Sequence, residues 1–121
     1  NYGELTFTIT NSVPVSLSVS ASVLDDNYSE VLYLPTSYNQ IEYIEVPQPE
    51  VSEIGETLMV GTKVQTITIF GDDIKQLLNN PYMMMEVKFN TAGDNNNPVK
   101  FKTTNEISFD IRLSAEYRVE L

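Results

Sequence analysis

The sequence contains no cysteine and no histidine, and each absence removes a class of chemistry. Without cysteine, disulfides, thiol nucleophiles and thiolate metal sites cannot form. Without histidine, the chain lacks the commonest general base, the commonest transition-metal ligand and the middle member of a serine hydrolase triad. The adjacent acids Asp25–Asp26 and Asp72–Asp73 are not spaced to converge across a cleft as glycosidase carboxylates do. We therefore expect a protein that is not an enzyme.

Basic residues are also scarce. Seven lysines and arginines stand against 17 aspartates and glutamates, a formal net charge of −10. This balance disfavours nucleic acids and anionic membrane surfaces as partners, because both need basic patches. Long apolar runs are missing too, so we expect no direct insertion into a membrane. At 121 residues the chain predicts a single domain over 1–121. We interpret it as a segment of a longer surface protein.

What the sequence does contain is a two-residue alternation of apolar and polar side chains. This period is typical of strands with one buried face. Turn residues separate the alternating segments, as in the cluster "DDNYSE" and the loop "AGDNNNP". Strands are expected at 4–10, 13–24, 31–34, 41–46, 62–70, 83–90, 99–103 and 107–121. The segment 47–55, with two prolines and two glutamates, is expected to be an edge or a loop.

One segment follows a helical period instead. "GDDIKQLLNNP" places Ile74, Leu77 and Leu78 on one face, with Asp72 or Asp73 able to cap the start and Pro81 to end it. About eight short strands and one crossover helix predict an all-β fold, a two-sheet immunoglobulin-like sandwich of Greek-key type. A closed barrel is the main alternative.

The closing segment "ISFDIRLSAEYRVEL" has the longest alternation in the chain. Ile107, Phe109, Ile111 and Leu113 are predicted to face the core, with Asp110 and Arg112 facing outward. Charges on the outer face of such a strand hinder pairing with foreign strands.

Two groups of residues are candidate ligand sites. The turn after the second strand offers the hard oxygen ligands that calcium prefers, Asp25, Asp26, Asn27 and Glu30. The spacing departs from the EF-hand pattern, and the same residue types favour tight turns without any ion. We expect no other cofactor.

The second candidate site surrounds the turn "PTSYNQ". Tyr33, Tyr38 and Tyr43 could stack on sugar rings, and Asn39 could hydrogen-bond sugar hydroxyls. Alternatively, these rings cover one end of the sandwich with their hydroxyls turned outward. The serines at positions 16, 18, 20 and 22 either face solvent or lie beneath another domain.

Several stretches together resemble a known group of domains. They are the run "TFTITNSVPVSLSVSASVLDDNY", with its N-S-x-P-V and LDDN turns, the helical "IKQLLNNP" and the alternating end. The pattern resembles the β-sandwich domains of secreted or lipid-anchored surface lipoproteins of Bacteroidetes, many of unknown function. The resemblance implies an immunoglobulin-like fold and a place outside the cytoplasm, anchored at the outer membrane or secreted.

The leading functional hypothesis is a non-catalytic extracellular module of a bacterial cell-surface protein, structural or adhesive. Its expected partners are other domains of the parent chain, and a glycan or a surface protein. The alternatives are a carbohydrate-binding module and a fimbrial-type subunit that assembles by strand addition.

Overall fold

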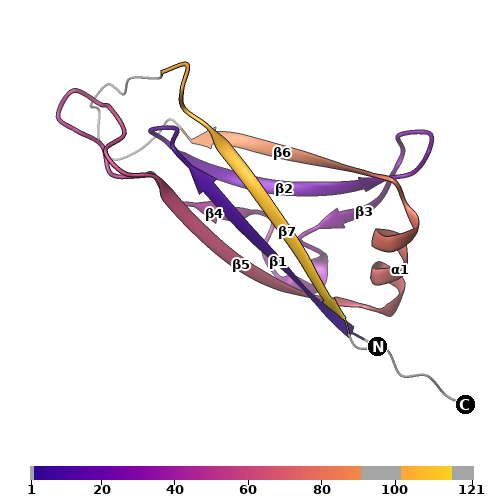
Figure 1. Cartoon of the computed structure of the whole chain (residues 1–121). Helices are drawn as coiled ribbons and strands as arrows, with labels where there is room; N and C mark the ends of the chain where they lie inside the picture. The colour runs from indigo at the N-terminus through magenta and orange to yellow at the C-terminus, as the bar shows by residue number, and fades with distance from the viewer. Residues whose placement is uncertain (1, 91–101, 116–121) are drawn as a thin grey trace, which may run out of the picture.

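The structure, a computed structural model, describes residues 2–90 and 102–115. Two antiparallel sheets and one α-helix make up the fold, which confirms the all-β prediction (Figure 1). The elements are β1 (Tyr2–Asn11), β2 (Ser16–Leu24), β3 (Glu30–Leu34), the 3₁₀ turn η1 (Ser37–Asn39), β4 (Ile44–Val46), β5 (Gly61–Phe70), α1 (Gly71–Asn79), β6 (Tyr82–Asn90) and β7 (Ile107–Ala115).

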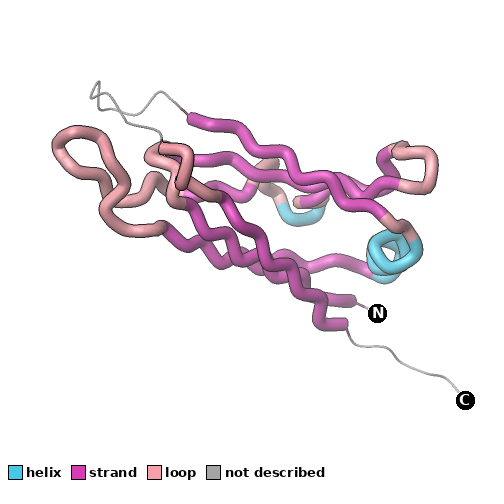
Figure 2. The backbone as a smooth tube through the Cα atoms, turned by 45° about the horizontal axis from the view of Figure 1, so that its top comes forward, coloured by secondary structure: helices cyan, strands magenta, loops and turns pink. Residues whose placement is uncertain are grey.

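The first sheet, sheet A, has the order β5-β1-β7, with β1 antiparallel to both neighbours. In the second, sheet B, β6 pairs with β2 from Ser16 to Leu24, so it occupies one whole edge of β2. The short strands β3 and β4 pair with different halves of β2 and therefore share its other edge. The two sheets lie one above the other, and α1 closes one end between them (Figure 2).

The two sides of this sandwich differ. β4 of sheet B contacts β5 of sheet A, and these two strands define what we call the closed side. Because β6 and β7 form the opposite edges of their sheets, they lie on the other side, which we call the open side. Consecutive strands β1 and β2 are each the middle of a sheet, so the chain changes sheet at its first turn.

That first turn is built by a buried asparagine. The Asn11 side chain is 0% exposed, and its Oδ1 accepts a hydrogen bond from the Val13 backbone N–H at 2.8 Å. Its Nδ2 donates to the Val15 carbonyl oxygen at 3.0 Å. Both ends of the amide therefore hold the chain between the sheets, and β2 begins at Ser16 rather than at position 13.

The core between the sheets consists of alternate residues from the strands. β1 and β2 supply most of it, with both of their inward rows fully buried. The buried apolar residues are Leu5, Phe7, Ile9, Val13, Val15, Leu17, Val19, Ala21, Val23, Leu32, Leu34, Ile44, Val46, Ile67, Ile69 and Ile74. The contribution of β6 and β7 is smaller, because their inward side chains are only partly buried against this cluster.

The helix predicted at 71–81 is present as α1, which connects sheet A to sheet B. Its buried residue Ile74 packs on the core, with Leu77 beside it. The expected cap was wrong in detail: Phe70 occupies the N-cap position, and Asp72 and Asp73 lie in the first turn. Negative charge there still interacts favourably with the helix dipole. Among residues 2–90 and 102–115, α1 is the only α-helix, and it is too short and too polar to cross a bilayer.

Two other strand predictions need revision. The strand expected at 41–46 is shorter, because it begins at Ile44 after the turn around η1. The strand expected at 99–103 lies mostly outside the described residues, and Lys102 and Thr103 are not in a strand. The segment 47–55, expected to be an edge or a loop, belongs to a loop over 47–60 with one isolated bridge between Val51 and Thr57.

Candidate functional site

The turn that joins β3 to β4 is attached to sheet A by one asparagine. Asn39 Oδ1 accepts hydrogen bonds from the Thr36 backbone N–H at 2.8 Å and from Thr36 Oγ1 at 3.0 Å. Asn39 Nδ2 donates to the Thr68 carbonyl oxygen of β5 at 3.1 Å. The amide that was predicted to bind sugar hydroxyls therefore holds η1 and links the turn across the closed side.

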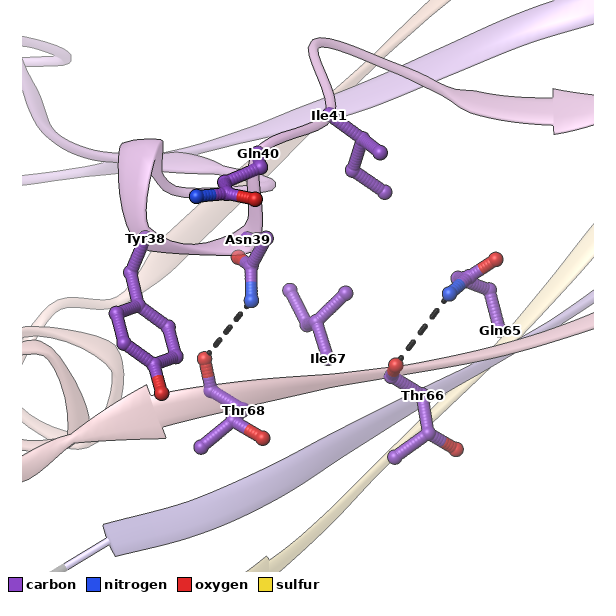
Figure 3. Close-up of a pocket in the computed structure, with 8 residues that line it drawn as sticks. All are labelled: Tyr38, Asn39, Gln40, Ile41, Gln65, Thr66, Ile67 and Thr68. Carbon is purple, nitrogen blue, oxygen red and sulfur yellow. Dashed lines mark hydrogen bonds between the residues drawn. The ribbon is translucent and has the colours of Figure 1, made fainter.

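A groove of about 450 Å³ lies between this turn and β5 (Figure 3). Its wall on the turn is Tyr38, Asn39, Gln40 and Ile41, and its wall on β5 is Gln65, Thr66, Ile67 and Thr68. The Tyr38 ring meets the Phe70 ring edge-on, with centroids 4.6 Å apart. Because Tyr38 remains 62% exposed, its ring is both supported by Phe70 and accessible.

The remaining polar groups of this groove are the side-chain amides of Gln40 and Gln65 and backbone carbonyls of β5. Gln65 Nε2 donates a long hydrogen bond, 3.4 Å, to the Thr66 carbonyl oxygen. The Thr66 side chain points to the outer face of sheet A, where its Oγ1 shares a hydrogen bond of 3.0 Å with Thr6 Oγ1 of the next strand. An accessible aromatic ring beside neutral donors and acceptors can bind a polar, uncharged ligand with apolar faces.

The four predicted sugar-binding residues are divided between two grooves. Tyr38 and Asn39 belong to the groove just described, whereas Tyr33 and Tyr43 line a second one of about 340 Å³. Ile41 lines both grooves. The second groove is completed by Pro35, Thr36, Ser37 and Glu42. Lys88 Nζ lies 5.3 Å from the centre of the Tyr43 ring, a cation–π contact that covers part of this ring.

The wall of the first groove that β5 supplies was not predicted from the sequence. A signal for it was present, because Lys63 and Gln65 occupy the same alternating register as the buried Ile67 and Ile69. When polar residues occupy the inward-facing positions of a strand, the apolar core does not extend to that part of the strand. Here that place is the groove below η1.

The candidate calcium ligands form a hydrogen-bonded turn. Asp25 Oδ1 accepts hydrogen bonds of 2.9 Å from the backbone N–H groups of Asn27 and Ser29. Tyr28 has a left-handed backbone, φ 61°, and its ring stacks on the Tyr82 ring with centroids 4.9 Å apart. In the part of the chain that the structure describes, no three His, Cys, Asp or Glu side chains gather as a metal site would require. Calcium at Asp25, Asp26, Asn27 and Glu30 stays a prediction.

In the serine row of β2, Ser18, Ser20 and Ser22 are buried and Ser16 is partly buried, although the row is on the outer face of sheet B. Two of the serines lie between longer side chains on both flanking strands: Ser18 is paired with Glu45 and Lys88, and Ser22 with Tyr33 and Met84. Ser18 Oγ donates to the Glu45 carboxylate at 2.9 Å and accepts from Asn90 Nδ2 at 3.1 Å. Ser20 is 1% exposed, and its Oγ has no hydrogen-bond partner among the described residues. The row is thus a line of polar side chains beside the strands that flank β2 in the same sheet.

The open side carries a second kind of surface. The residues of β7 predicted to face inward do so and are partly buried: Ile107, Phe109, Ile111 and Leu113. Asp110 and Arg112 face outward, as predicted, and Arg112 Nε lies 3.2 Å from Asp110 Oδ1. The inward residues of β6 are also incompletely covered, and Phe89 is 52% exposed. Two apolar rows therefore reach the surface on this side.

A scan against protein-family models, a search of curated proteins and a search of solved structures each returned no match to this chain.

Proposed function

We propose that this chain is a non-catalytic β-sandwich module of a bacterial cell-surface protein, with a structural or adhesive role. We also propose that its two sheets follow the immunoglobulin-like Greek-key plan, which is supported by the position of consecutive strands β1 and β2 in the middle of different sheets. The observation that carries the functional proposal is the open side, where β6 and β7 leave their inward apolar rows partly exposed.

Apolar surface of this kind is most stable when another polypeptide covers it. Burial contributes roughly 25 cal/mol for each Å² of apolar surface removed from water. The open side adds two strand edges, because β6 pairs only with β2 and β7 only with β1 within the described residues. Unpaired strand edges offer backbone donors and acceptors to a partner. A surface that combines both features suits contact with a neighbouring domain or subunit.

Thiol labelling tests the proposal directly, because the chain contains no cysteine of its own. We would produce Phe89→Cys, on the open side, and Val64→Cys, on the exposed outer face of β5, in the cells that naturally make the protein. A membrane-impermeant maleimide should label Val64→Cys on intact cells, since the module is proposed to be extracellular. Phe89→Cys should be protected on cells and labelled in the purified chain. Failure to label Val64→Cys on intact cells would refute the location, and equal labelling of both positions would refute the covered side.

The groove below η1 favours a second candidate function, carbohydrate binding. Tyr38 is accessible and supported by Phe70, and the amide side chains of Asn39, Gln40 and Gln65 line the same groove. Affinity electrophoresis in gels that contain soluble polysaccharides would test this function. Tyr38→Ala and Gln65→Ala should abolish retardation, while Tyr28→Ala, which changes an exposed tyrosine outside both grooves, should leave it intact. No retardation of the unchanged chain by any polysaccharide would reject this candidate.

A further inference from the structure

Among the described residues, one edge of β7 is unpaired, so its backbone groups can pair with a partner. β7 pairs with β1 from Ile107 opposite Asn11 to Ala115 opposite Gly3, and no other described strand pairs with it. Just before β7, the Ser12 N–H donates to the Glu106 carbonyl oxygen at 2.9 Å. In an antiparallel ladder, successive residues direct their N–H and C=O groups to alternate sides. The odd-numbered residues from Ile107 onward therefore direct these groups away from β1, toward the open side.

The order of side chains along β7 is complementary to itself. If two copies of β7 run antiparallel with Ile111 opposite Ile111, then Asp110 lies opposite Arg112 of the other copy, and Arg112 opposite its Asp110. In the same register Phe109 faces Leu113, and Ser108 faces Ser114. Charge therefore meets opposite charge on the outer face, and apolar side chains meet on the inner face.

We propose that β7 is a self-association edge, through which two copies of this chain join as a twofold dimer with sheet A continuous across both. The contact is isologous, so each copy gives and receives the same groups. The inference rests on the proposed function in using the same open side, and it names a second copy as the partner.

Charge selects both the partner and the register. Although the chain has a net charge of −10, the described strands of the open side are neutral, because β6 carries Glu86 and Lys88, and β7 carries Asp110 and Arg112. Two acidic copies can therefore meet along these strands without opposing net charge. Moving the centre of pairing to Asp110 would place the two aspartates opposite each other, and moving it to Arg112 would oppose the arginines. Like charges directly opposite destabilise a strand pair.

Sedimentation velocity of the purified chain, from about 1 μM to about 1 mM, tests the association. The unchanged chain should dimerise with increasing concentration. Asp110→Arg alone and Arg112→Asp alone should each weaken the dimer about tenfold or more, because each replaces both cross-strand ion pairs by repulsion. An equimolar mixture of the two variants should form a heterodimer again, because their charges complement each other. This recovery separates pairing from misfolding.

The register has its own test. Ile111→Cys places two thiols opposite each other at the twofold axis, so mild oxidation should give a disulfide-linked dimer. Leu113→Cys is the matched control and should not link to itself, because its partner would be position 109 of the other copy. A chain that stays monomeric at every concentration, or equal linking of the two variants, would overturn the inference. Neither result would bear on the labelling of Phe89→Cys on cells, so the dimer and the proposed function can fail separately.

Discussion

The closed and open sides of this sandwich are built from the same kind of strand, yet they bury their inward residues to different extents. On the closed side, Ile44, Val46 and Ile69 are at most 1% exposed. On the open side, the inward residues of β6 and β7 are only partly buried. The strictest alternation in the sequence, that of β7, thus belongs to a poorly covered strand. Alternation reveals which way a side chain points, and the opposite sheet decides how deeply it is buried.

A pair of phenylalanines gives the largest expected contrast. Phe7 of β1 is 1% exposed, so Phe7→Ala should lower the free energy of unfolding by about 4 kcal/mol. Phe109→Ala, in the strand that pairs with β1, should cost about half as much because that side chain is only partly buried. Urea unfolding followed by circular dichroism measures both. Equal losses would mean that the open side is packed as tightly as the core.

The next largest effect is expected at the turn between the two sheets. Asn11→Ala would leave the Val13 N–H and the Val15 carbonyl without their buried partner. The expected loss in the free energy of unfolding is about 2–3 kcal/mol. Asn80→Ala is a suitable control, since among the described residues its amide bonds only to Gln76, at the exposed end of α1. Its loss should cost about 0.5 kcal/mol or less. A loss at Asn11 no larger than that at Asn80 would contradict the role of Asn11 in joining the sheets.

On the closed side, Asn39→Ala should cost about 1–2 kcal/mol, because it removes the link between η1 and β5. The same change should raise the hydrogen-exchange rate of the Thr36 amide, whose acceptor is lost. Exchange at the Asn27 amide, in the separate turn held by Asp25, should stay the same and serves as the internal reference. An unchanged Thr36 rate would show that the turn is held by other contacts.

The smallest effect is expected at Ser20. Its buried hydroxyl has no described partner, so Ser20→Ala should leave stability unchanged or raise it by up to about 1 kcal/mol. Ser18→Ala is the contrasting variant, since it removes hydrogen bonds to Glu45 and Asn90 and should destabilise by about 1 kcal/mol. Thermal melts of the two variants would compare them, and a clear loss at Ser20 would show that its hydroxyl is bonded in solution.

Much of the fold could be predicted from the sequence, because alternation and turn residues are local signals. They identified β1, β2, β5 and the helix, and they gave the correct facing of β7. They could not predict pairing, since alternation does not name the neighbouring strand. The serine row was misleading for this reason: whether its serines are exposed or buried depends on the strands that flank β2, namely β3, β4 and β6, which lie far away in sequence.

The candidate site was predicted only in part, and for a related reason. The turn at 35–40 was identified from its composition, but the groove exists only because β5 lies beneath it. Asn39 shows why residue type is a weak guide to binding. An amide can serve a ligand or the backbone equally well, and here both of its ends are used within the chain.

The pairing of Gly3 with Ala115 has a mechanical consequence. A pulling force applied through the outer ends of β1 and β7 would act on two adjacent antiparallel strands at the same end of the molecule (Figure 1). Their hydrogen bonds, which run across the strands, would then be loaded one pair after another, as in opening a zipper, and not all together in shear. Loaded in this way, the domain would unfold at low force. It is therefore poorly suited to transmit a pulling force between β1 and β7.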